Sequence, residues 1–407
     1  MESMRTVFTI ITVVLGTATG FISTGCEPAT AATGGCAPSK ARYDVTLPGH
    51  PFSAQQSPDG KTVFVSLVSS GPKSPNGLAV LHCDGARYRY SHTVLLESQP
   101  TGMAISHDGK TLVVADDGFI VFVDAVAAAQ QKNPALVGYM QDLEGSPEDN
   151  DPGSVYANFS PDDRYAFVSE EQNATITVID MAKARASHFS RSSIVGEIPV
   201  GEAPIALTFS NDGRYLFTTT EVAKREDGFP KECKMGSEPD ARSVERGVIY
   251  TIDVAKAETD PAHSVMSKTL AGCSPVRLAI APDGSVVWVT DRSSNDVRAF
   301  STAKLIAGGP DALLQTVAVG ANPVPVAVTR DGRYVLVGNS NRFGANAGTP
   351  QTVSVVGTNQ GKAVGSIAVG AFPREFEHGS GTTLFLANYG SSTLTVFNTA
   401  RLMELLH

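Results

Sequence analysis

The sequence predicts an all-β protein in which one four-stranded unit is repeated seven times around a ring. A Ser-x-Asp-Gly-type turn recurs along the chain, with successive gaps of 49, 54, 50, 71, 48 and 49 residues. Alternating apolar stretches, typical of antiparallel strands, flank each turn. Four strands in each of seven repeats define a seven-bladed β-propeller with four-stranded antiparallel blades. The turns are anchored at Asp59, Asp108, Asp162, Asp212, Asp283, Asp331 and Ser380.

The N-terminal 39 residues precede the first repeat. Residues 1–25 are predicted to be a secretory signal peptide, because their apolar run, Val7 to Leu15, is far shorter than a membrane span of about 20 residues. Ser23-Thr24-Gly25-Cys26 resembles a bacterial lipobox, which implies acylation of Cys26. Ordinary cleavage near Ala29 to Ala32 and a disulfide at Cys26 are the alternatives. Residues 26–39 are expected to be a tether, and residues 40–407 a single propeller domain.

The last repeat supplies only three strands before the chain ends. A strand-like segment, Arg42 to Leu47, directly precedes the first repeat and belongs to no other unit. We therefore expect this N-terminal strand to pair with the last blade and close the ring, which removes two free sheet edges.

Connections that are longer than the fold needs are expected on one face of the ring. Counting strands from the centre outward, the Asp-Gly turns join the first and second strands of each blade. The longest connections join second to third strands, at 69–76, 221–246 and 339–351, or join blades, as the acidic segment 142–151 does. Loops of this kind usually carry function, so the face opposite the Asp-Gly turns is the candidate functional face.

Four cysteines can be paired by the face on which they lie. Cys233 and Cys273 are placed on the loop-rich face, and Cys36 and Cys83 on the opposite face. Four cysteines allow three pairings, and the two alternatives would bridge opposite faces. The predicted disulfides are therefore Cys36–Cys83 and Cys233–Cys273, which suit an exported protein and leave Cys26 unpaired.

The repeats resemble those of the YVTN-repeat and lactonase-like seven-bladed propellers. The residues that carry the resemblance are Leu384 to Phe397, with the core Leu-Ala-Asn-Tyr-Gly-Ser, and the stretch Pro323 to Gly332. A single Trp, Trp288, argues against WD40 blades. The resemblance covers about residues 41–398 and implies the fold more specifically than a function.

Lactonase-like enzymes of this shape carry Pro-Arg-His at the start of an inner strand and a Glu at the end of the next strand. Here Glu221 is a counterpart of the Glu, whereas Ile205 and Ala206 replace the Arg and the His. The general base and the oxyanion-stabilising cation of that pattern are therefore missing. The remaining candidates for catalysis are His50, Glu221, Arg277 and Arg374.

Polar residues at the ends of the second strands form another candidate site. Such a ring of oxygens around the central funnel could hold Ca²⁺ or a cationic or polyhydroxylated ligand, and a solvated acidic rim is the structural alternative. No other cofactor is expected. The funnel candidates are Asp116, Glu170, Asp291, Asn339 and Asn388.

Composition limits the function classes. With 32 basic and 41 acidic side chains, the net charge of −9 argues against nucleic-acid binding. We expect an exported, monomeric protein of the bacterial periplasm or cell surface, held to a membrane only through a lipid anchor. It would act as a binding or scaffold module for a small molecule, an envelope protein or a polysaccharide. A lactonase-like hydrolase that uses the same funnel is the alternative, and a surface interaction protein is a third hypothesis.

Overall fold

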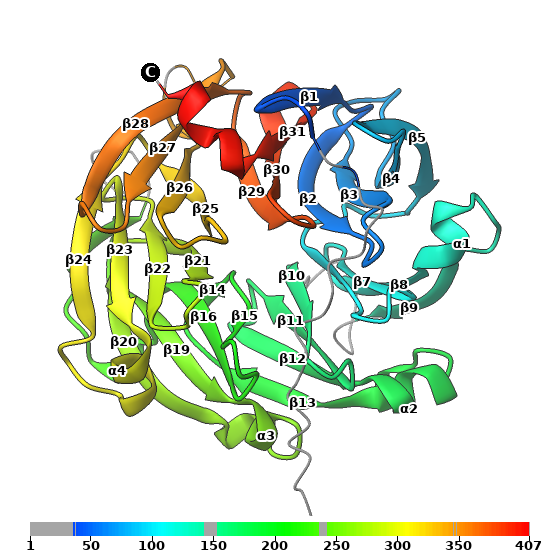
Figure 1. Cartoon of the computed structure of the whole chain (residues 1–407). Helices are drawn as coiled ribbons and strands as arrows, with labels where there is room; N and C mark the ends of the chain where they lie inside the picture. Colours follow the sequence, from blue (N-terminus) through cyan, green and yellow to red (C-terminus); the bar gives the residue numbers. More distant parts are fainter. Residues whose placement is uncertain are drawn as a thin grey trace, which may run out of the picture. The chain divides into compact units, whose positions relative to one another are not determined.

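Seven antiparallel sheets stand side by side in a ring in the computed structural model (Figure 1). The structure describes residues 36, 38–141, 153–235, 242–344, 346 and 348–406. The signal peptide, Cys26, most of the tether and the acidic segment 142–151 lie outside the described residues. The all-β prediction is confirmed, with four strands in every blade.

The blades follow one another along the chain. Blade 1 consists of β2 (His50–Gln56), β3 (Thr62–Val68), β4 (Gly77–Cys83) and β5 (Tyr88–Leu95). Blade 2 consists of β6 (Met103–Ile105), β7 (Thr111–Ala115), β8 (Phe119–Asp124) and β9 (Leu136–Gln141). Blade 3 consists of β10 (Ser154–Phe159), β11 (Tyr165–Glu170), β12 (Thr175–Asp180) and β13 (Ile194–Pro199). Blade 4 consists of β14 (Glu202–Pro204) with β15 (Thr208–Phe209), β16 (Tyr215–Val222), β19 (Gly247–Asp253) and β20 (Val265–Gly272).

The remaining blades complete the ring. Blade 5 consists of β21 (Pro275–Ile280), β22 (Val286–Asp291), β23 (Asp296–Ser301) and β24 (Leu313–Ala318). Blade 6 consists of β25 (Pro323–Val328), β26 (Tyr334–Asn339), β27 (Gln351–Gly357) and β28 (Lys362–Val369). Blade 7 consists of β29 (Pro373–His378), β30 (Thr383–Asn388), β31 (Thr393–Asn398) and β1 (Arg42–Thr46).

Short helices follow the third strands or lie in connections. The α-helices are α1 (Ala125–Ala129), α2 (Met181–Ala186), α3 (Val254–Ala257) and α4 (Thr302–Ala307). Each is capped by the last residue of the preceding strand, Asp124, Asp180, Asp253 or Ser301, whose side chain accepts a hydrogen bond from the first turn. The 3₁₀ turns are η1 (Arg191–Ser193), η2 (Arg225–Asp227), η3 (Pro261–His263), η4 (Tyr389–Ser391) and η5 (Thr399–Leu405). None of the helices in the described ranges combines the length and apolar character that crossing a membrane requires.

The N-terminal strand closes the ring, as predicted. β1 pairs antiparallel with β31 over five residues, from Arg42 opposite Phe397 to Thr46 opposite Thr393. It also contacts blade 1, because the backbone amide of Tyr88 donates to the hydroxyl of Tyr43 at 2.9 Å. β1 therefore joins the first and last blades.

The recurring Ser-x-Asp turn has a structural explanation. Ser57 Oγ donates to Asp59 Oδ1 at 2.6 Å and accepts from the Thr62 amide at 3.0 Å, while Asp59 Oδ1 accepts from the Lys61 amide at 3.0 Å. The same three bonds recur in blades 2, 3, 4 and 6 around Ser106, Ser160, Ser210 and Thr329. They pair backbone donors at each turn, so the motif serves the fold.

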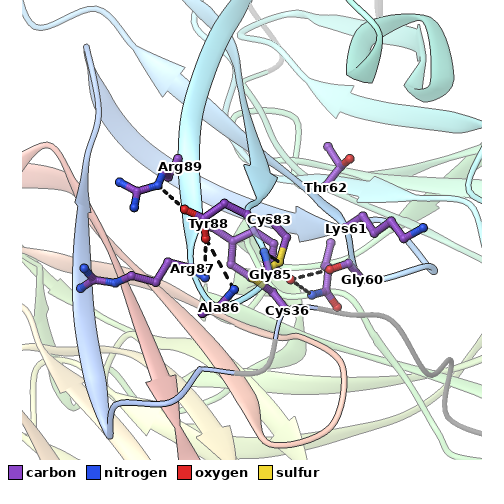
Figure 2. The surroundings of a disulfide bond; sticks show 12 residues. Cys36, Gly60, Lys61, Thr62, Cys83, Gly85, Ala86, Arg87, Tyr88 and Arg89 are labelled. Carbon is purple, nitrogen blue, oxygen red and sulfur yellow. Dashed lines mark hydrogen bonds and ion pairs between the residues drawn. A yellow bond between two sulfur atoms is a disulfide. The ribbon is translucent and has the colours of Figure 1, made fainter.

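Both predicted disulfides are present. Cys36–Cys83 links the segment before β1 to the end of β4, beside the turn that contains Gly60 and Lys61 (Figure 2). Tyr88 donates to the Gly60 carbonyl at 2.6 Å in the same place. Cys233–Cys273 links the insertion of blade 4 to the connection between blades 4 and 5. That insertion contains a small hairpin, β17 (Cys233–Met235) and β18 (Arg242–Val244).

Candidate functional site

The innermost strands of blades 1, 5, 6 and 7 change register after their first or second residue. The shift lies between Pro51 and Ala54 in blade 1, and at matching places in blades 5, 6 and 7 after Pro275, Pro323 and Pro373. Bulges of this kind re-aim side chains and are frequent beside functional sites. The residues within these irregular stretches are the ones that meet at the centre of the ring.

The central layer consists mostly of apolar side chains. Phe52, Val155, Ile205, Val276 and Val324 form one buried cluster with contributions from five different blades. In blade 7, Arg374 follows Pro373 as Val324 follows Pro323, so a guanidinium stands where the other blades place an apolar group. This guanidinium contacts the aromatic ring of Phe52, whose centroid lies 4.1 Å from Arg374 Cζ.

A cavity of about 270 Å³ lies above this layer, on the face that carries the long loops. Its floor is apolar, with Val155, Ile205, Val276 and Val324, and its charged groups come from five blades. The charged lining residues are Glu171, Glu221, Arg277, Arg292, Arg342 and Arg374. We call it the central cavity. Three of the four sequence-based candidates for catalysis, Glu221, Arg277 and Arg374, therefore line one cavity.

Two of the four arginines are paired with carboxylates. Arg277 Nε donates to Glu375 Oε2 at 2.5 Å, and both side chains are buried. Arg292 Nη2 donates to Glu221 Oε2, also at 2.5 Å. Each of these arginines still has one buried nitrogen without a hydrogen-bond partner among the described residues, Nη1 of Arg277 and Nε of Arg292.

The other two arginines are held by aromatic rings. Arg342 Cζ lies 5.0 Å from the ring centroid of Phe343 and 5.4 Å from that of Phe372. Arg374 Cζ also lies 5.4 Å from the Phe372 centroid, so Arg374 contacts both Phe372 and Phe52. Arg292 Cζ lies 5.3 Å from Phe343. We call this series the arginine–aromatic ladder; its members are Arg292, Phe343, Arg342, Phe372, Arg374 and Phe52.

Arg342 and Arg374 have no carboxylate within ion-pair distance among the described residues, and Arg374 Nε is buried without a partner. An aromatic face attracts a guanidinium through its π system. It accepts no conventional in-plane hydrogen bond, so the N–H donors of both arginines remain free for an anion.

The pKa values of the cavity reflect this concentration of charge. Burial, followed by repulsion from Arg277 and Arg342, lowers the pKa of Arg374 to about 9. Burial and the neighbouring Glu221 raise the pKa of Glu171, against the attraction of the arginines. A bound anion would relieve the repulsion among the guanidinium groups, because opposite charge favours their ionised form.

His50 is not brought to the central cavity. Its Nδ1 lies 2.7 Å from the Tyr389 carbonyl oxygen, and its ring stacks on the Tyr389 ring at 4.7 Å between centroids. The contacts join the start of blade 1 to η4 of blade 7. His50 therefore connects blade 1 to blade 7 and does not line the central cavity.

The five funnel candidates do not line the central cavity either. Asn339 donates to Thr352 and Ser354 of β27, and Asn388 to Thr393 and Thr395 of β31. Asp291 accepts from the Cys273 amide and pairs with Arg298 at 2.9 Å. These side chains extend across the third strand of their own blade, so the expected ring of oxygens around the funnel does not describe this cavity.

The two remaining funnel candidates are also buried in the blades. Glu170 accepts from Ser154 Oγ at 3.0 Å. Asp116 has no hydrogen-bond partner for either carboxylate oxygen among the described residues, and burial with repulsion from Asp117 and Glu97 raises its pKa to about 7. In the described part of the chain, no group of three or more His, Cys, Asp or Glu side chains is placed to hold a metal ion.

The site residues selected from the sequence do not include Arg292 or Arg342, and Glu171 enters there only as the neighbour of the candidate Glu170. Glu171 and Arg292 each stand one position beyond the polar residue that ends the second strand of blades 3 and 5, and Glu221 follows Thr220 near the end of β16. Because successive side chains of a strand point to opposite faces, the residue after the strand end reaches the cavity and the strand end itself does not. Arg342 lies in the long connection 339–351, which had been assigned to the functional face.

A larger groove of about 840 Å³ lies between blades 2 and 3 on the opposite face. Most of its charged side chains interact with one another or with the backbone. Lys110 pairs with Asp108, and Arg164 pairs with Asp162. Asp124 and Asp180 cap the helices α1 and α2. The remaining cation of the groove among the described residues is Arg185, which is exposed to solvent, whereas Arg374 of the central cavity is half-buried.

Comparisons with known proteins agree with the fold. No protein-family model and no curated protein matches the sequence. Among solved structures, the chain is similar to a chain of hydrazine synthase from Kuenenia stuttgartiensis, with a TM-score of 0.62 and 18% identity over 87% of this chain and 96% of that chain. At this identity the similarity concerns the fold alone, so the YVTN and lactonase-like resemblance stays a prediction. The chain is a seven-bladed β-propeller with an arginine-lined central cavity.

Proposed function

We propose that this chain is an exported binding protein of the bacterial envelope whose central cavity takes a small organic anion. The observation that carries the proposal is the pair Arg342 and Arg374, two guanidinium groups that contact aromatic rings and form no ion pair with a described carboxylate. Charge-assisted hydrogen bonds from arginine to a carboxylate are about twice as strong as neutral ones and are often bidentate.

The test is ligand-dependent thermal stability in a low-salt buffer, with butyrate as the anion and butyramide as its uncharged analogue. Ligand at about 100 times its Kd stabilises a protein by about 2.7 kcal/mol, so butyrate should raise the melting temperature and butyramide should not. Arg374→Gln should abolish the butyrate effect. Arg333→Gln is the matched control, since Arg333 is exposed and pairs with Asp331 at a turn on the opposite face. Equal responses to butyrate and butyramide would refute the proposal.

A lactonase-like hydrolase is the second candidate, and Glu171 is the observation that favours it. Its raised pKa suits a general base, and Arg374 and Arg277 lie on the same cavity wall to stabilise an oxyanion. Water would attack the lactone carbonyl and give its proton to Glu171, and the bond from the carbonyl carbon to the ring oxygen would break as Glu171 returns that proton to the ring oxygen, which leaves a hydroxy acid. The hydrolysis of γ- and δ-lactones by the wild type, with its loss in Glu171→Gln, would support this candidate. Binding of butyrate without any lactone turnover would exclude it.

Export and anchoring are part of the proposal. The two disulfides favour an oxidising compartment, and residues 1–26 carry the leader and lipobox-like pattern. The wild type should fractionate with membranes if Cys26 is acylated, and Cys26→Ser should release it. An unchanged distribution in Cys26→Ser would refute the anchor and leave the binding proposal untouched.

A further inference from the structure

We infer that the anion is an aliphatic dicarboxylate whose two carboxylates bridge two separate arginine pairs in the central cavity. This inference rests on the proposed function and adds the ligand class to it. The two pairs are defined by position: Arg277 and Arg374 come from the innermost strands β21 and β29, whereas Arg292 and Arg342 follow the second strands β22 and β26. We call them the floor pair and the rim pair.

The floor pair offers donors deep in the cavity. Arg277 is 3% exposed, and its Nη1 has no partner, as is true of Arg374 Nε. Both side chains line the central cavity, and repulsion between these two guanidinium groups contributes to the lowered pKa of Arg374. One carboxylate placed between them would accept from both nitrogens and offset that repulsion.

The rim pair repeats this arrangement nearer to solvent. Arg292 keeps a buried Nε without a partner after pairing with Glu221. Repulsion from Arg292 also contributes to the lowered pKa of Arg342. Phe343 lies between the two, at 5.3 and 5.0 Å from their Cζ atoms, so both are anchored to one ring.

The separation of the pairs is limited by the ladder. Arg342 Cζ and Arg374 Cζ each lie 5.4 Å from the Phe372 centroid, so they are at most twice that distance apart. A separation within this limit can be bridged by two carboxylates joined by a few methylene groups.

Part of the lining of the central cavity is apolar. Val155, Ile205, Val276 and Val324 line the same cavity as the arginines, and a methylene chain would remove both surfaces from water at about 0.8 kcal/mol per buried CH₂. The cavity volume of about 270 Å³ equals that of about nine water molecules at about 30 Å³ each. Succinate has eight non-hydrogen atoms and glutarate nine, so both are of matching size.

Charge balance points the same way. Glu375 and Glu221 offset Arg277 and Arg292, which leaves Arg342 and Arg374 opposite Glu171. With Glu171 protonated, two positive charges remain for the ligand, and the raised pKa of Glu171 makes its protonation easier. With Glu171 protonated, a dianion neutralises both guanidinium groups, whereas a monoanion neutralises one.

The experiment compares calorimetric affinities of the full chain for succinate, glutarate, butyrate and inorganic phosphate. The expected order is succinate or glutarate at least tenfold tighter than butyrate or phosphate. Arg342→Gln, at an exposed position, should lower dicarboxylate affinity at least tenfold and butyrate affinity by a smaller factor. Arg374→Gln should weaken both ligands, with Arg374→Lys as the variant that keeps a cation if the Gln variant fails to fold. Arg333→Gln serves again as the control.

The outcomes separate the two proposals. If butyrate binds in an Arg374-dependent way but dicarboxylates bind no tighter, the dicarboxylate inference is overturned and the anion-binding function stands. Phosphate binding as tight as succinate would also overturn the bridging geometry, because a single compact anion engages one pair. If neither butyrate nor any dicarboxylate binds, the proposed function itself fails.

Discussion

Glu377 is the residue for which the structure gives the clearest pH-dependent stability. It lies on β29 with its Oε2 3.2 Å from Gln55 Nε2, which donates to it. Burial, followed by repulsion from Glu375, raises its pKa from 4.5 to about 8. The unfolded chain loses this proton near pH 4.5 and the folded chain keeps it until about pH 8. Between these values the folded state binds more protons, so stability falls as pH rises.

The magnitude follows from the size of the shift. A pKa unit corresponds to 1.36 kcal/mol, so the change from 4.5 to about 8 sets an upper limit of about 5 kcal/mol for the cost of the ionised side chain above pH 8. Glu377→Gln cannot ionise and keeps an oxygen that can accept from Gln55. The free energy of unfolding of Glu377→Gln should therefore equal that of the wild type at pH 5 and exceed it by several kcal/mol at pH 9.

The assay is urea unfolding at pH 5, 6, 7, 8 and 9, followed through the fluorescence of Trp288, with both disulfides intact. Glu404→Gln is the control, because Glu404 is exposed and its pKa is lowered by the hydrogen bond from Arg401. That variant should show no gain at high pH. A constant difference between Glu377→Gln and the wild type from pH 5 to 9 would show that Glu377 ionises freely in the folded protein, and the reasoning would be wrong.

Two further predictions concern packing and cross-linking. Gly102→Ala should destabilise the fold by about 2–3 kcal/mol, since a Cβ there would lie 2.3 Å from a ring carbon of Tyr156. The control is Gly309→Ala, which should leave the free energy of unfolding in the same urea titration unchanged because no atom lies within 4 Å of the new Cβ. Replacing Cys36 and Cys83 by Ser should cost about 4 kcal/mol, the loop-entropy value for a separation of 47 residues; unchanged stability would show that β1 pairing alone closes the ring.

The fold could be read from the sequence because its signals are local and repeated. The Ser-x-Asp turns, the alternating strands and the unassigned strand before the first repeat each specify a short-range structure. The count of blades and the role of β1 then follow from arithmetic. The disulfides could be predicted because the repeat assigns every connection to a face, and Cys233 and Cys273 share one.

The site was only partly predictable, because its geometry depends on single-residue shifts. Arg277 and Arg374 were found through their place after Pro275 and Pro373, where bulges turn them inward. The ring of strand-end residues was displaced by one position, which changes the face to which a side chain points. Glu171 rather than Glu170 lines the cavity for this reason. No pattern in the sequence marks where a bulge begins, so that parity had to come from the structure.

The arginine–aromatic ladder also bears on how the ring holds together. It runs from blade 5 through blades 6 and 7 to Phe52 of blade 1. It therefore connects blade 7 to blade 1 across the seam that the pairing of β1 with β31 closes. A ligand on Arg374 would clamp this seam from inside the funnel. Occupancy should then slow amide exchange in β1 and β31, far from any atom that the ligand touches.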